Sequence, residues 1–138
     1  MAKKRKSRSQ RPERLEPTTV LCRGGDCGSR RKHPDVDHGG QLRTLQRTLG
    51  RAAVLPSKCL EACEHSNVAV VLPGAAGQAA GATAVWVGEV LDAEMTDAII
   101  DWVQAGGPGV AEPATLLQIR EFSPTRVSRT LLDAGEVV

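Results

Sequence analysis

Aromatic residues are nearly absent from this 138-residue chain, which has two Trp, one Phe and no Tyr. Proteins that bind single-stranded nucleic acids commonly stack bases on exposed aromatic rings, so this scarcity disfavours a nucleic-acid-binding function. Apolar residues still make up 41% of the chain, enough for a modest core built mainly from Val, Leu, Ile and Ala. The length indicates one domain with tails.

Long apolar runs and catalytic motifs are also missing. No run approaches the roughly 20 residues of a membrane-spanning helix, and no apolar segment follows the basic N-terminus as it would in a secretory signal. The stretch from Gly74 to Gly81 spaces its glycines wrongly for a phosphate-binding loop and is not followed by Lys and Ser or Thr. No nucleophile elbow is present. We therefore expect a protein that is not an enzyme and does not enter a membrane.

Positive charge gathers at the N-terminus. Residues 1–16 contain seven Lys and Arg against two Glu, whereas residues 17–138 contain eleven Lys and Arg against fourteen Asp and Glu. A disordered basic tail at 1–17, acting as a tether or solubility device, is the favoured interpretation. The run from Lys3 to Lys6 also matches a nuclear-localisation or nucleic-acid patch, but such motifs are weak.

Cysteine is rare, and its placement is the most informative feature of the chain. The four cysteines form Cys22-x4-Cys27 and Cys59-x3-Cys63, with 31 residues between the pairs. Thiolates bind zinc ions and iron–sulfur clusters, and two short loops can bring four of them to one point. The alternatives to an iron–sulfur cluster are structural zinc, free thiols and two disulfides. Because no secretory signal precedes them, we expect these thiols in the reducing cytoplasm.

The pattern of apolar residues predicts an α/β fold, a four-stranded mixed sheet with packed helices. One strand is predicted before the first of two amphipathic helices and three strands between the two helices, with a flexible hairpin loop at Gly74–Thr83, and Pro56 is expected to end the second strand. A further element around Leu116–Phe122 is expected at the sheet edge. The predicted strands are Thr18–Arg23, Ala52–Leu55, Val68–Leu72 and Ala84–Val87, and the predicted helices are Gly39–Arg51 and Asp92–Ala105. We place one domain at residues 18–122 and a flexible tail at 123–138.

These motifs, in this order, resemble the thioredoxin-like [2Fe–2S] ferredoxins, including the ferredoxin-like small subunit of respiratory NADH dehydrogenases. The resemblance covers Thr18 to Phe122. Its pieces are Thr18–Cys22, Cys27-Gly28, Cys59–Cys63, Asn67–Pro73, Val85–Gly88 and the helix that closes on Gly106-Gly107.

The resemblance implies a thioredoxin-like fold with the cluster loops at one end. A single [2Fe–2S] cluster would be bound with Cys22 and Cys27 on one iron and Cys59 and Cys63 on the other. It further implies a one-electron carrier, a homodimer, and a redox partner protein such as a reductase or oxidoreductase. Glu61 departs from the family, which often has Gly there, and a carboxylate beside an anionic cluster should disfavour reduction. The Cys-x-x-Cys of a disulfide-active thioredoxin is absent.

Two other functions remain open. One is a zinc-stabilised four-cysteine interaction module, and the other is a cluster-bearing subunit of a larger flavin- or NADH-linked complex. Among the remaining polar residues, His65 is expected to be a loop residue, and His33 and His38 are expected in a solvated loop. Glu94, Asp97 and Asp101 could dock a basic partner, although a solvated helix face is the simpler interpretation.

Overall fold

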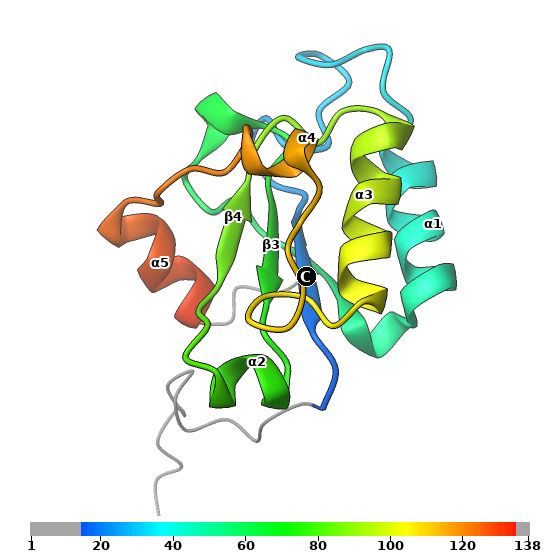
Figure 1. Cartoon of the computed structure of the whole chain (residues 1–138). Helices are drawn as coiled ribbons and strands as arrows, with labels where there is room; N and C mark the ends of the chain where they lie inside the picture. The colour runs from blue at the N-terminus through cyan, green and yellow to red at the C-terminus, as the bar shows by residue number, and fades with distance from the viewer. Residues whose placement is uncertain (1–14, 135–138) are drawn as a thin grey trace, which may run out of the picture.

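The computed structural model describes residues 15–134, and its centre is a four-stranded mixed sheet (Figure 1). The strand order is β2-β1-β3-β4, with β1 parallel to β2, β3 antiparallel to β1, and β4 antiparallel to β3. The α/β class and the mixed four-stranded sheet predicted from the sequence are confirmed. The strands are β1 (Thr18–Cys22), β2 (Val54–Ser57), β3 (Ala69–Leu72) and β4 (Val85–Val87).

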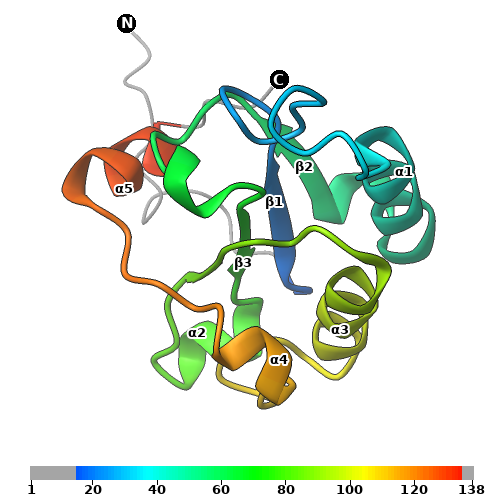
Figure 2. The same ribbon diagram turned by 90° about the horizontal axis from the view of Figure 1, so that it is seen from above.

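Two amphipathic helices cover one face of this sheet. Helix α1 (His38–Leu49) connects β1 to the parallel strand β2, and α3 (Ala93–Gln104) follows β4; Figure 2 shows them side by side. Each begins at an aspartate whose side chain accepts a hydrogen bond from a backbone amide of the first turn, which satisfies an otherwise unpaired donor. Between helices and sheet lies an aliphatic core that includes Leu21, Leu45, Val54, Val71 and Ile99.

The opposite face of the sheet is covered by loops and by the C-terminal helix α5 (Arg126–Asp133). Leu132 of α5 packs there in a second buried cluster that also contains Val20, Val70 and Trp86. Cys22 and Cys27 belong to this cluster. The first cysteine pair therefore lies on the sheet face away from α1 and α3.

Three local predictions were wrong. The helix α2 (Ala75–Ala79) stands where a flexible hairpin loop was predicted, and it is held by the packing of Gly77 against the Pro108 carbonyl. Helix α5 occupies a segment predicted to be a loose tail. Pro56 does not end β2 but pairs with Leu21 within it, which an edge strand allows because one side of it needs no amide donors.

The other elements follow the sequence closely. The predicted element near Leu116 is the short helix α4 (Thr115–Gln118), in which Leu117 is fully buried, and Glu121 then bridges to Val87 of the edge strand β4. The predicted basic tail at 1–17 falls mostly outside the described residues. Within residues 15–134, no helix has the length and apolar character needed to cross a membrane.

Candidate metal centre

The first cysteine pair is formed where β1 runs into a loop. Cys22 is the last residue of β1 and Cys27 lies in the loop, with 2% and 3% of their surfaces exposed. A hydrogen bond from Cys27 lowers the pKa of the Cys22 thiol from 9.0 to about 6. The same bond, followed by burial, raises the pKa of Cys27. In the metal-free protein this pair therefore holds one thiolate and one thiol near neutral pH.

The second pair lies in the loop after β2. The Cys59 and Cys63 sulfur atoms are 3.7 Å apart, and both residues are partly exposed. Cys63 opens a 3₁₀ turn that extends to His65. Burial raises the pKa of Cys59, and its neighbour Cys63 raises it further. All four cysteines are free thiols in the structure.

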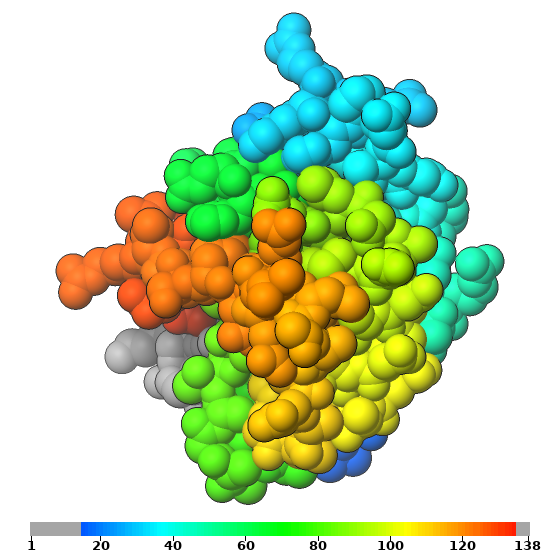
Figure 3. Space-filling view, turned by 45° about the horizontal axis from the view of Figure 1, so that its top comes forward, coloured from blue at the N-terminus to red at the C-terminus, as the bar shows by residue number. Residues whose placement is uncertain are grey.

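The two cysteine loops pack directly against each other. A Cβ atom added to Gly25 would lie 2.7 Å from the Cys63 sulfur and 2.9 Å from the Cys59 sulfur. One added to Gly24 would lie 2.1 Å from the Cys59 nitrogen. Figure 3 shows the second loop in green beside the first loop in blue. Glycine is therefore required here because only a residue without a side chain lets the first loop lie on the second pair.

The arrangement is two pairs of thiols. Among residues 15–134, no three or more His, Cys, Asp or Glu side chains converge as a group that could hold one metal ion. The two pairs do interact electrostatically, since Cys63 raises the pKa of Cys27 and Cys22 raises the pKa of Cys59. A [2Fe–2S] cluster takes two thiolates on each iron, so two adjoining pairs match its donor set better than that of a single ion.

Backbone amides point at the sulfur atoms. The Val68 amide donates to the Cys27 sulfur at 3.3 Å, and the Glu61 amide donates to the Cys59 sulfur at 3.4 Å. Such donors stabilise negative charge on a thiolate and tune a bound metal group. With four thiols, two amide donors and a glycine-lined contact between the loops, the residues present fit an iron–sulfur cluster.

A buried polar network holds the first loop, and sequence reasoning missed it. Asn67 is fully buried, accepts from the Gly28 amide at 2.9 Å and bonds His38 Nδ1 at 2.9 Å. The His38 ring also bonds the His33 carbonyl, and the His33 ring bonds Ser66 Oγ, both at 3.0 Å. His38 therefore lies buried at the start of α1, which corrects the predicted solvated loop. The polar Asn67 directly before a buried apolar strand was the available signal.

Two cations lie near the pairs. The Arg23 guanidinium donates to the Cys22 carbonyl, the His38 carbonyl and Gln41 Oε1. Burial lowers the pKa of Arg23, whereas the neighbouring thiols of Cys27 and Cys22 oppose this shift. Lys32 Nζ donates to the Cys63 carbonyl at 2.7 Å, so it ties the end of the first loop to the second pair. Positive charge near thiolates favours their charged form.

The second loop is also held from its outer side. Glu61 has a φ of 55°, in the left-handed region, which explains why a Gly would be favoured there. Ser128 of α5, almost fully buried, donates from its hydroxyl to the Glu61 carbonyl at 3.3 Å. His65 stacks on Phe122 with ring centroids 3.8 Å apart. The structure thus places His65 in an aromatic contact at the end of the second loop.

No family model, curated protein or solved structure matches this chain.

Proposed function

We propose that this protein is a one-electron carrier, a ferredoxin that binds a single [2Fe–2S] cluster through Cys22, Cys27, Cys59 and Cys63. One observation carries the proposal: two thiol pairs, 31 residues apart in the sequence, lie on two loops packed together through Gly24 and Gly25. The separate pairing of the thiols matches a cluster with two irons better than one zinc ion.

The sheet supports the thioredoxin-like part of the proposal. A parallel β1 and β2 joined through α1, followed by the antiparallel β3 and β4 and then α3, is the order expected of a thioredoxin-like core. In this arrangement both cysteine loops extend from the ends of the parallel strands β1 and β2, since Cys22 closes β1 and Cys59 follows β2 by two residues. Neighbouring parallel strands place their carboxyl ends at one edge, so the pairs must meet there.

The cluster, when bound, would supply a reversible one-electron change. The chain itself would set the conditions for it. The amides of Val68 and Glu61 donate to ligand sulfur atoms, and Arg23 adds a nearby positive charge. The first pair is buried, whereas the second is partly exposed. We propose that the Cys59 and Cys63 side faces the redox partner, because that side has the shorter path to the surface.

The partner we propose is a protein reductase or oxidoreductase, and the compartment is a reducing one such as the cytoplasm, where thiols remain available as ligands. The homodimer implied by the family resemblance is part of the same proposal.

The test is a visible absorption spectrum of the protein purified without oxygen, with iron, sulfide and zinc measured on the same sample. We expect charge-transfer bands that bleach on reduction, with about two irons and two sulfides per chain. A colourless protein with one zinc per chain would overturn the carrier function and make the cysteines a structural site. A stable flavoprotein partner on purification would instead identify a subunit of a larger complex.

The ligands are tested by Cys59→Ser, which should greatly weaken or shift the visible bands because it removes one of four thiolates. His65→Ala is the matched control from the same loop, and it should keep the visible bands because it removes a contact with Phe122 and leaves all four thiolates in place. Unchanged bands in Cys59→Ser would remove Cys59 from the ligand set.

A further inference from the structure

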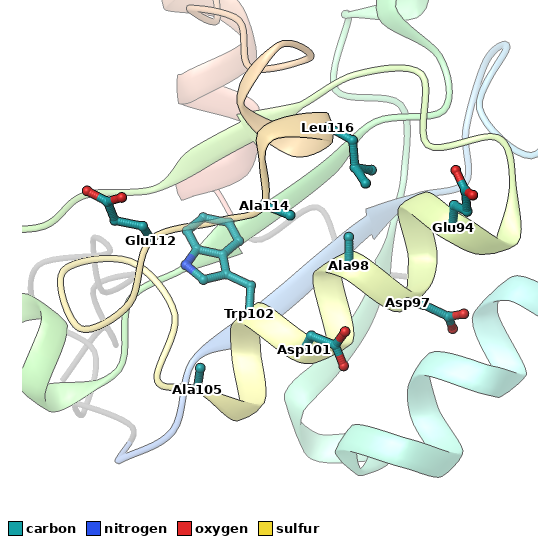
Figure 4. Close-up of a pocket in the computed structure, with 9 residues that line it drawn as sticks. All are labelled: Glu94, Asp97, Ala98, Asp101, Trp102, Ala105, Glu112, Ala114 and Leu116. Carbon is teal, nitrogen blue, oxygen red and sulfur yellow. The ribbon is translucent and has the colours of Figure 1, made fainter.

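A groove lies between α3 and α4 (Figure 4). It is on the side of the molecule where helices cover the sheet. It has a volume of about 570 Å³. Apolar side chains of Ala98, Trp102 and Leu116 line its wall, and the Trp102 ring is fixed by a 2.7 Å hydrogen bond from Nε1 to the Ala111 carbonyl. The wall is therefore preformed.

Carboxylates surround this apolar wall. They come from α3 and from the segment before α4, and Figure 4 shows them along the groove. Within residues 15–134, no ion pair joins any of them to a basic side chain. An apolar wall with unneutralised carboxylates suits an occupant that carries basic side chains on apolar stems. The four carboxylates are Glu94, Asp97, Asp101 and Glu112.

The described chain begins at Leu15, which packs against Gly74 just before α2, and at Pro17 it reaches the loop that follows α3. A Cβ atom on Gly107 would lie 2.8 Å from Pro17 Cγ, so Pro17 packs against the loop that follows α3. Ala105, two residues before Gly107, lines the groove. Figure 3 shows the first described residues, in blue, next to the yellow segment at the end of α3. Residues 1–14 therefore join the described chain at Leu15, beside the start of α2, and Pro17 lies against the loop that follows the groove residue Ala105.

Charge and length both suit those fourteen residues. Residues 1–14 contain seven Lys and Arg and one Glu, a net charge of +6, whereas residues 15–138 contain eleven Lys and Arg and fifteen Asp and Glu, a net charge of −4. Fourteen extended residues span up to about 46 Å. The twelve-residue α3 is about 18 Å long, so the segment can run the full length of the groove.

We propose that the basic N-terminal segment, residues 1–14, binds in the acidic groove between α3 and α4 of its own chain. Lys and Arg head groups pair with the carboxylates at the rim, and their aliphatic stems cover the apolar wall. The bound segment shields this surface from other basic proteins, and it leaves when salt screens the attraction. The proposal does not depend on the cluster.

Zero-length carbodiimide cross-linking of the full-length protein tests this directly, because only five lysines exist. Three of them, Lys3, Lys4 and Lys6, lie in the segment, and the other two are Lys32 and Lys58. Mass spectrometry should find amide bonds from the three N-terminal lysines mainly to the groove carboxylates. These products should fall severalfold at about 1 M salt, where the Debye length is about 3 Å.

A matched pair of variants separates the groove from general negative charge. Asp97→Asn with Asp101→Asn should sharply reduce cross-linking of the segment to the remaining groove carboxylates, Glu94 and Glu112. Asp35→Asn with Glu121→Gln removes two exposed carboxylates elsewhere and should leave it unchanged. Equal effects of the two double variants, or cross-links spread evenly over the surface, would overturn the proposal.

Mixing isotopically heavy and light protein before cross-linking identifies the chain that supplies the segment. Products that join only heavy to heavy and light to light are expected. Mixed heavy–light products would overturn binding within one chain and assign the groove to the segment of a second copy. The visible spectrum of the same samples reports separately on the cysteine site, so failure of one proposal is distinguishable from failure of the other.

Discussion

The loop that carries Cys22 and Cys27 and the loop that carries Cys59 and Cys63 meet in one place but are held differently. The first pair is buried on the sheet face, and the side chain of Asn67 fixes its loop through Gly28. The second pair is partly exposed and is held by contacts from outside its loop. Lys32 reaches the Cys63 carbonyl, and Ser128 of α5 reaches the Glu61 carbonyl.

This difference would suit two tasks of the cluster site that we propose. The buried loop provides a rigid wall, since its polar partners are themselves buried and satisfied. The partly exposed loop leaves one side of the site open toward solvent, where a partner protein could approach. Its backbone tolerates a strained residue at Glu61 because α5 and Lys32 hold it in place.

Breaking the contact between the two cysteine loops should have the largest effect on cluster binding and on stability. Gly25→Ala adds a Cβ that would lie under 3 Å from both sulfur atoms of the second pair, in a residue with a φ of 59°. Strain at positive φ costs about 1 kcal/mol, and overpacking adds about 1–3 kcal/mol. We expect the variant to lose the visible bands after reconstitution and to unfold at lower urea concentration.

Gly81→Ala is the control for this change, because Gly81 has a φ of 86° and no atom within 4 Å of an added Cβ. Its free energy of unfolding should fall by only about 1 kcal/mol because of the positive φ. The variant should reconstitute normally. Equal reconstitution of the two variants would show that the loops do not need this close contact.

The second largest effect should be a difference in acidity between the two thiol pairs. In the metal-free protein, the hydrogen bond from Cys27 lowers the Cys22 pKa from 9.0 to about 6, about a thousandfold change in acidity, whereas burial raises the Cys59 pKa. As pH rises through about 6, one thiolate should form and increase the ultraviolet thiolate absorption. Cys22→Ser should abolish this step and Cys59→Ser should preserve it. A first step that forms only near pH 9 in the unaltered protein would contradict the assignment.

Removing the brace of the first loop should have an intermediate effect. Asn67→Ala leaves the Gly28 amide and the His38 ring nitrogen without their partner in a buried site, which should lower the free energy of unfolding by about 2–3 kcal/mol. Urea unfolding of the metal-free protein measures this. Alkylation mapped by mass spectrometry should increase at Cys22 and Cys27 more than at Cys59 and Cys63.

Gln78→Ala provides the comparison, because it also removes an amide side chain, but one at an exposed position that donates to the Pro73 carbonyl. Its stability should change by less than about 0.5 kcal/mol. If Asn67→Ala exposed all four thiols equally, the two loops would be one unit and not two.

Relieving the strain in the second loop should have the smallest effect. Glu61→Gly removes a side chain from a residue with a φ of 55°, so we expect the folded metal-free protein to gain up to about 1 kcal/mol. Glu61→Ala removes the same carboxylate but keeps the strain. Both variants should raise the reduction potential of the loaded protein, and only the glycine variant should be more stable. Equal stability would show that α5 and Lys32 impose no strain on this loop.

Regular elements were predictable where a local pattern specifies them. The helix predicted at Asp92–Ala105 is α3 at Ala93–Gln104, because an apolar stripe and the capping Asp92 lie within the segment itself. The strand predicted at Val68–Leu72 is β3 at Ala69–Leu72, since a continuous apolar run bounded by Asn67 and Pro73 is typical of a buried strand.

Elements without such a pattern could not be predicted. Residues 126–133 form α5 because Leu132 packs with Val20, Val70 and Trp86 on the sheet, and a short polar segment gives no sign of that distant contact. The sequence predicts that Pro56 ends a strand, although its place on an edge strand removes the cost of its missing amide. The domain limits drawn from the sequence, at 18 and 122, remain a prediction.

The sequence by itself determined the inventory: four thiols in two close pairs, the helix faces, and a basic segment joined to an acidic body. These depend on residues near one another in the chain, which pattern and charge counts describe fully. Only the tertiary structure decided that Gly25 lies on the second pair, that Asn67 braces the first, and that the acidic groove lies between α3 and α4. Each of these is a contact between segments far apart in sequence, and such contacts are set by how the sheet, helices and loops pack together.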